Sequence, residues 1–187
     1  MDTTSKPAGT LEEVLAFWFA PGREAEWFAG SEAFDAAVRA ALGPLQQAAA
    51  AGELDAWAET PRGSLVLVIL LDQVPRQLYR GQAAAFACDA AARRIAAAAV
   101  ERGFDRQLET AERFFLYLPF EHSEELGHQH VAVSLIGALG REEWTGYAER
   151  HREIIERFGR FPHRNAALGR STTEAEAAFL LEPGSSF

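Results

Sequence analysis

The sequence contains a single cysteine, Cys88, in 187 residues. An internal disulfide framework is therefore excluded, and because Cys88 lies among alanines we interpret it as a small, buried and inert thiol. Zinc-spaced cysteines, a glycine-rich phosphate loop and a Gly-x-Ser-x-Gly motif are all missing. The familiar nucleotide-dependent and serine-hydrolase chemistries are therefore not expected, and no cofactor is predicted.

Positive charge is scarce: 18 lysines and arginines oppose 27 aspartates and glutamates, which gives a net charge of −9. A protein that binds nucleic acid or anionic lipid usually carries a basic face, so neither nucleic acid nor a membrane is expected as a partner. Residues 141–170 are the exception, with seven arginines against five glutamates. That local surplus leaves room for one anion-binding pocket.

The first nine residues are polar and contain no apolar core. They fit neither a signal peptide nor a membrane span, which predicts a cytoplasmic location. We expect residues 1–9 to be flexible. Residues 10–187 show no linker or repeat and are long enough for one domain with a substantial core.

Helix signals run through the whole chain. Thr10 and Glu13 form a capping box for a helix that should reach Phe19. Ser31 should cap the next helix, which Gly43-Pro44 is expected to interrupt. Thr60-Pro61 has the pattern of an N-cap followed by a proline at the first helical position.

The run Leu65–Leu71 is apolar on all sides and partly β-branched, so a strand competes with a helix here. We favour a central buried helix, because no second run of this kind could pair with a lone strand. Asp72-Gln-Val-Pro75 should end it.

Further helices are expected over residues 83–101, 110–119, 121–139, 142–158 and 175–181. In the helix over 142–158, the side chains expected to face the core are Trp144, Tyr147, Ile154, Ile155 and Phe158. Ser171 and Glu174 match a second capping box, which should open the last of these helices. Phe187 is expected to dock on the protein. The sequence thus predicts an all-α single domain of about seven to eight helices.

The segment Phe158–Arg170 interleaves aromatic residues with arginines, a histidine and an asparagine. Gly159, Pro162 and Gly169 make it a poor helix or strand. Its backbone groups must find partners outside a regular ladder, so we expect a structured loop.

Five blocks of the chain are unusual: Val14–Phe19, Leu71–Asp89, Phe115–Glu124, Phe158–Thr172 and Pro183–Phe187. Together they resemble the uncharacterised bacterial family labelled domain of unknown function 924. The resemblance implies an all-helical fold of antiparallel hairpins, similar to tetratricopeptide proteins. It implies no activity and assigns no catalytic residue.

Polar residues gather at three expected helix ends: Asp72, Gln73, Arg76 and Arg80; Glu121, His122, Ser123 and Glu124; Arg160, His163, Arg164, Asn165 and Arg170. If these ends converge, the arginines could bind a carboxylate or phosphate, and a histidine beside a carboxylate could act as general acid or base. The catalytic candidates are His122, His163, Glu121 and Asp72. The candidate ligand-binding residues are Arg76, Arg80, Glu121, His122, Ser123, Glu124, Arg160, His163, Arg164, Asn165 and Arg170. The alternative is that these side chains cap helices and pair with one another, as structural ion-pair networks do.

A metal site is an alternative interpretation, because Glu125-Leu-Gly-His128 is one half of a di-iron motif and lies close to Glu121 and His122. A second half is missing from the sequence. Glutamates at a helix start more often stabilise the helix dipole, and no metal is predicted.

Three functions remain open. The favoured one is a binding module for a small anionic ligand or a peptide carboxylate. The second is a hydrolase or lyase on an anionic substrate, with His122 or His163 as acid or base and Arg160 or Arg164 as electrostatic stabiliser. The third is a protein-interaction scaffold that uses a concave surface of stacked helices.

Overall fold

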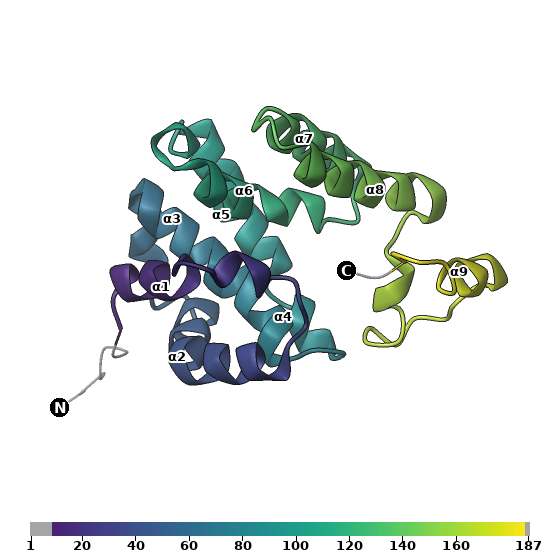
Figure 1. Cartoon of the computed structure of the whole chain (residues 1–187), viewed down its shortest axis with the longest axis horizontal. Coiled ribbons are helices and arrows are strands. Elements are labelled where there is room, and N and C mark those ends of the chain that lie inside the picture. Colours follow the sequence, from purple (N-terminus) through teal and green to yellow (C-terminus); the bar gives the residue numbers. More distant parts are fainter. Residues whose placement is uncertain (1–8, 186–187) are drawn as a thin grey trace.

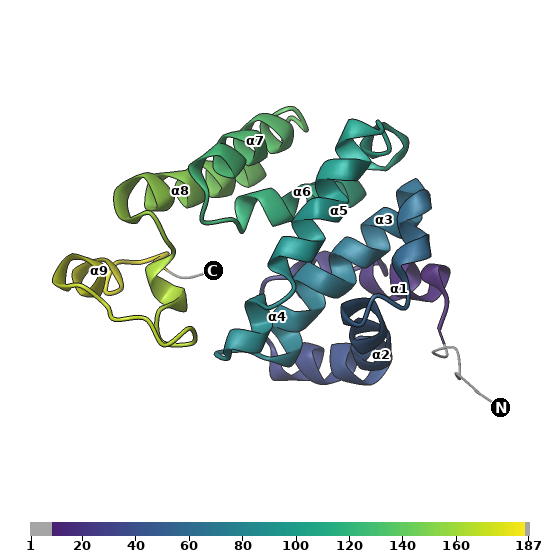
Figure 2. The ribbon, with the colours of Figure 1, turned by 180° about the vertical axis from the view of Figure 1, so that it is seen from behind.

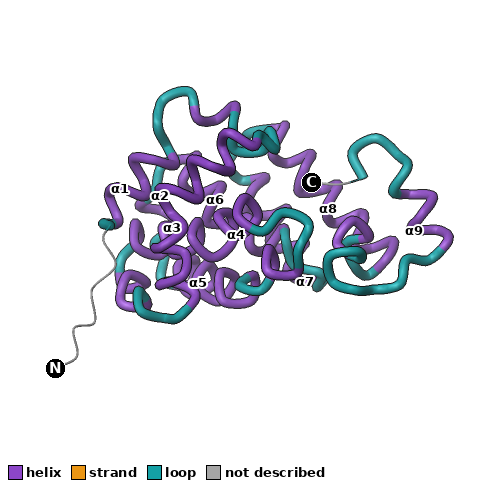
Figure 3. The backbone as a smooth tube through the Cα atoms, turned by 90° about the horizontal axis from the view of Figure 1, so that it is seen from below, coloured by secondary structure: helices purple, strands orange, loops and turns teal. Residues whose placement is uncertain are grey.

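The computed structural model describes residues 9–185. The expected docking of Phe187 and the expected flexibility of residues 1–8 concern positions outside this range. The α-helices are α1 Leu11–Trp18, α2 Glu32–Ala50, α3 Pro61–Val68, α4 Val74–Leu78, α5 Asp89–Glu101, α6 Thr110–Glu121, α7 Leu126–Gly137, α8 Glu142–Phe158 and α9 Glu174–Phe179. Between residues 9 and 185 there is no strand, which confirms the all-α prediction (Figure 3).

Three of the four predicted caps are present. In the Thr10–Glu13 box, the Thr10 amide donates to the Glu13 carboxylate at 2.6 Å and the Glu13 amide donates to Thr10 Oγ1 at 3.3 Å. Ser31 and Thr60 cap α2 and α3. The fourth prediction was wrong in register, because Thr173 and Glu176 form the box that opens α9.

The buried run Leu65–Leu71 is helical, with every residue at most 3% exposed. The helix does not end at Asp72, as the sequence had suggested. A π-helical segment, Ile69–Gln73, carries it into α4, and the Val74 amide bonds to the Ile69 carbonyl. Because Pro75 has no amide hydrogen to donate, a wider turn just before it lets the chain stay helical. Figure 2 shows the helical stretch that leads from α3 to α4. Asp72 and Gln73 belong to this stretch and are buried.

Two other helix ends were predicted wrongly, both at a proline. α2 continues through Pro44, and α6 continues through Pro119 to Glu121. A proline in a helix interior costs about 3 kcal/mol, but α2 buries Val38 and Leu42 before Pro44 and Leu45 after it. Packing of one continuous apolar face offsets the lost hydrogen bond.

Two further predicted helices and one predicted inward residue differ from the structure. Since α6 runs to Glu121, the predicted helix over 121–139 begins only at Leu126. The predicted helix over 83–101 is a 3₁₀ turn, Ala83–Phe86, followed by α5 from Asp89. α8 spans residues 142–158 as predicted, but Tyr147 is 51% exposed and does not face inward.

Helices α1 to α6 form one body, in which α3 contacts α1, α5 and α6 (Figure 1). The hairpin of α7 and α8 packs beside α6, and α9 lies at the far end of the molecule. A small second core of Ile154, Ile155, Phe161 and Phe179 joins α8, the following loop and α9. The α7–α8 pair is a helical hairpin, while a wider likeness to tetratricopeptide proteins stays a prediction. In the described part of the chain, no helix is both long and apolar enough to cross a membrane.

Candidate functional site

Asp72, on the π-helical segment, lies at the centre of a buried polar cluster. Its side chain is fully buried, and its two oxygens lie 2.8 and 3.0 Å from Nδ1 of His122. Gln73 Nε2 donates to the same carboxylate at 2.6 Å, and Arg76 Nη1 lies 3.3 Å from it. Burial alone would raise the pKa of Asp72, but Arg76 and His122 outweigh burial and hold that pKa well below its usual range. Asp72 is therefore a charged carboxylate.

Arg76 links Asp72 to Asp89, the first residue of α5. Its two terminal nitrogens donate to the two oxygens of Asp89 at 3.0 Å each, in the parallel geometry of a strong arginine–carboxylate pair. The donors of Arg76 are thus largely used within the protein.

Arg164, in the 3₁₀ turn Pro162–Arg164, differs from Arg76. Its side chain is only 7% exposed and lies between the rings of Phe86 and Phe161, whose centroids are 4.7 and 4.5 Å from the guanidinium carbon. Its nearest carboxylate oxygen among the described residues, in Asp89, is 3.5 Å away, and Nε has no hydrogen-bond partner within residues 9–185. Burial and the neighbouring Arg76 lower the pKa of Arg164 to about 10, so the side chain is still charged at neutral pH. A buried cation with unused donors is costly without an anion.

Three histidines surround this cation. The ring centroid of His151, on α8, is 6.3 Å from that of His122 and 5.5 Å from that of Phe161. His163 lies 5.6 Å from Phe161 by the same measure. Burial is the main cause that lowers all three histidine pKa values, to about 3 for His151 and for His163. The three rings are neutral at pH 7.

Glu121, the last residue of α6, completes the group. Its side chain is 5% exposed, Oε1 lies 3.4 Å from Nδ1 of His151, and Oε2 has no hydrogen-bond partner between residues 9 and 185. Burial, with a smaller effect from the charge on Asp72, raises the pKa of Glu121 to about 8. At neutral pH it is mostly a protonated acid.

We call this group the central cluster: Asp72, Arg76, Asp89, Glu121, His122, His151, His163 and Arg164. Together with Phe161, members of the cluster form a closed ring of contacts. The ring runs from His122 to Asp72, Arg76, Asp89, Arg164, Phe161, His151 and back to His122. The three chain segments that the sequence analysis singled out do meet here.

A second group, which we call the loop clamp, consists of Glu124, Arg160, Asn165, Arg170 and Glu176. Arg170 donates to both oxygens of Glu124 at 2.7 and 3.0 Å, to Asn165 Oδ1 at 3.0 Å and to the Phe161 carbonyl at 3.0 Å. Arg160 donates to both oxygens of Glu176 at 2.6 and 2.8 Å and to the Ser171 carbonyl at 2.8 Å. These residues hold the loop in place, so the structural alternative fits them better than ligand binding.

Two predicted residues lie outside both groups. Arg80 pairs with Asp35 at 2.8 Å and is half exposed. Ser123 Oγ lies 2.9 Å from Nδ1 of His128 and shapes the turn between α6 and α7. Within residues 9–185 no group of three or more histidine, cysteine, aspartate or glutamate side chains could hold a metal ion.

Sequence reasoning missed Asp89 and His151. Asp89 had been placed inside a longer helix, whereas it stands at the start of α5. His151 shares the buried face of α8 with Ala148, Ile154 and Ile155, and this spacing could have identified it.

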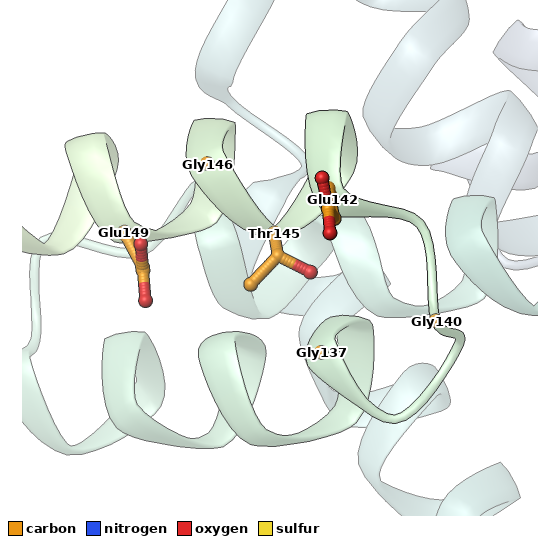
Figure 4. A pocket seen from close by; sticks show the side chains of 6 residues that line it. All are labelled: Gly137, Gly140, Glu142, Thr145, Gly146 and Glu149. Atoms are coloured by element: carbon orange, nitrogen blue, oxygen red, sulfur yellow. The ribbon is translucent and has the colours of Figure 1, made fainter.

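Two surface hollows lie away from the central cluster. One, of about 440 Å³, runs between α7 and α8, where Thr145 and Glu149 lie on the side of α8 that faces α7 (Figure 4). The other, of about 290 Å³, lies between the turn after α1 and the start of α6. Neither includes a residue that the sequence singled out.

The fold and the cluster define an all-α protein with a buried ionic network where its helices and the 159–170 loop meet. The chain matches the family described as "Bacterial protein of unknown function (DUF924)" over residues 14–184, and it belongs to that family. A solved structure, the protein of unknown function ATU0120 from Agrobacterium tumefaciens, is similar to it with 42% sequence identity and a TM-score of 0.87. The match covers 91% of this chain and 96% of that one. No curated protein matches the chain.

Proposed function

We propose that this protein binds a small anionic ligand, or the carboxylate of a peptide, at Arg164. The observation that carries the proposal is the combination of burial and unused donors in this one side chain. A guanidinium has five N–H donors, and among residues 9–185 the one polar contact of the Arg164 guanidinium is the 3.5 Å approach to Asp89. A carboxylate or phosphate would fill the remaining positions with paired, charge-assisted hydrogen bonds.

The surroundings support an anion as the guest. Phe86 and Phe161 both pack against the guanidinium, which reduces the entropy lost on binding. Glu121, which would repel an anion if ionised, is mostly protonated at neutral pH.

The test compares two arginine variants. Arg164→Met keeps an unbranched apolar stem between the two rings and removes the charge. Arg94→Met is the matched control, because Arg94 is an exposed residue of α5. The melting temperature of each protein is measured with phosphate, acetate, benzoate and succinate, and calorimetry follows for any anion that stabilises the wild type.

The proposal expects at least one of these anions to raise the melting temperature of the wild type and of Arg94→Met. The rise should disappear in Arg164→Met while the protein stays folded. If Arg164→Met unfolds the protein, Arg164 has a structural role and the proposal is wrong. An equal response in all three proteins would also contradict it.

The interaction-scaffold hypothesis has less support. Large exposed apolar side chains come from several separate segments: Phe28, Leu126, Val131, Tyr147, Leu168 and Leu181. The scaffold hypothesis and the cytoplasmic location both stay predictions.

A further inference from the structure

We propose that the central cluster is a hydrolytic site, in which His122 acts as a general base on water and Asp72 positions it. The substrate class is a small ester that carries an anionic group, and Arg164 holds that group. This inference rests on the proposed function, because it uses the same arginine as the anchor.

The first support is the tautomer that the geometry imposes on His122. Asp72 is ionised and can only accept, so the close contact with Nδ1 requires a hydrogen on that nitrogen. A neutral imidazole then carries its lone pair on Nε2. That is the arrangement in which a histidine removes a proton from water.

The second support is access. The hydrogen bonds of the His122 ring to Asp72 both use Nδ1, and the side chain keeps 11% of its surface exposed. His122 is the C-cap of α6, where the chain leaves the helix and turns toward α7. We place the attacking water on this partly exposed side of the ring, next to Nε2.

The third support is the rigidity of Asp72. Gln73 and Arg76 both contact its carboxylate, and the π-helical segment brings it into the cluster. π-Helical turns occur frequently at functional sites. A purely structural aspartate would not need its histidine partner to keep one nitrogen open.

The chemical step balances within the site. Nε2 takes a proton from water as the water oxygen bonds to the ester carbonyl carbon. The tetrahedral intermediate then collapses, the C–O bond to the alcohol breaks, and the protonated imidazole returns its proton to the departing oxygen. The products are a carboxylic acid and an alcohol, and His122 ends neutral.

The probe is 4-acetoxybenzoate, whose carboxylate can lie on Arg164 and whose ester is at the opposite end of the ring. Its methyl ester is the uncharged counterpart, and 4-methoxybenzoate is the non-hydrolysable analogue for binding. Release of 4-hydroxybenzoate is followed by absorbance for the wild type and for His122→Gln, Asp72→Asn and Arg164→Met. His130→Gln is the matched control, because that histidine is 59% exposed on α7.

The wild type and His130→Gln should hydrolyse 4-acetoxybenzoate at least tenfold faster than its methyl ester. His122→Gln should lower kcat by about 10²-fold or more, within the usual range for loss of a general base, with little change in the binding of 4-methoxybenzoate. Asp72→Asn should lower kcat and change the pH profile, because the amide can stabilise the wrong tautomer. Arg164→Met should mainly raise KM. Should Asp72→Asn fail to fold, His122→Gln decides the question.

The outcomes separate the two claims. If 4-methoxybenzoate binds through Arg164 but the ester is not turned over, or is turned over equally by His122→Gln, the hydrolytic inference is overturned and the binding proposal stands. If 4-methoxybenzoate does not bind, both are overturned for this ligand class.

Discussion

The central cluster and the loop clamp both contain arginines and carboxylates, yet one arginine of the 159–170 loop in each group satisfies its charge in a different way. In the clamp, Arg170 makes four hydrogen bonds to Glu124, Asn165 and the backbone of Phe161. In the cluster, Arg164 is more deeply buried, and its one polar side-chain contact within the described residues is 3.5 Å long. Both arginines come from the same loop, six residues apart in the sequence.

The difference shows how to assign roles within one arginine-rich loop. An arginine whose donors pair with several groups inside the protein stabilises the fold. A buried arginine with open donors is costly, which favours an anion as its partner. The contacts of Arg160 and Arg170 therefore fit a structural role, and Arg164 is the residue for which we propose a functional one.

The largest expected effect concerns two glutamates, one in each group. The pKa of Glu121 is raised to about 8, whereas the hydrogen bond from Arg170 and the amide of Phe161 lower the pKa of Glu124 despite its partial burial. A carboxyl group with a raised pKa in the folded state stabilises the protein at low pH. That contribution is lost as the pH rises from about 4.5 through 8.

Glu121→Gln should remove this pH dependence, because glutamine is neutral throughout. Relative to the variant, the wild type should lose roughly 3 to 4 kcal/mol of unfolding free energy between about pH 5 and about pH 9. Chemical denaturation at a series of pH values measures the difference. Glu101→Gln, an exposed control, should leave the slope unchanged. Parallel curves for the wild type and Glu121→Gln would show that Glu121 is ionised in the folded protein.

The next effect compares the two arginines directly. Arg170→Ala should lower the unfolding free energy by about 1 to 3 kcal/mol, because Glu124 and Asn165 lose their partner. Arg164→Met should change it by less than about 1 kcal/mol, since a poorly paired buried charge contributes little net stability. Urea unfolding of both variants tests the contrast. If Arg164→Met lowered the unfolding free energy more than Arg170→Ala, Arg164 would be the structural arginine, and the contrast would be contradicted.

The smallest effect is expected at Arg80, which the sequence had grouped with the site. Its pairing with Asp35 is about half exposed, so Arg80→Ala should cost no more than about 1 kcal/mol. The response of the melting temperature to anions should be that of the wild type. A lost response would place Arg80 back among the ligand-binding residues.

Local signals in the sequence predicted the fold well where one interaction decides the outcome. The Thr10–Glu13 capping box and the buried run Leu65–Leu71 belong to this group, because caps and apolar runs act over a few residues. At Pro44, Pro75 and Pro119 the sequence predicted a break or an end of a helix, and these predictions were wrong. Tertiary packing and a π-helical turn kept those helices continuous, and neither is visible in local sequence.

The site could be predicted in outline only. The sequence identified Asp72, His122 and Arg164 as polar residues at helix ends, and the structure brings them together. It could not separate Arg164 from Arg170, because their difference lies in which donors find partners after folding. Asp89 was missed because the break before α5 depends on packing of the 3₁₀ turn Ala83–Phe86.

The most direct test of the central claim follows the Nε–H signals of Arg164 and Arg170 in one ¹⁵N NMR titration with an anion. The Nε–H of Arg170 donates to Asn165 Oδ1, whereas that of Arg164 has no acceptor in the part of the chain that the structure describes. Binding at the cluster predicts a saturable shift of the Arg164 signal and a nearly constant Arg170 signal. A constant Arg164 signal with every anion that stabilises the protein would contradict the account.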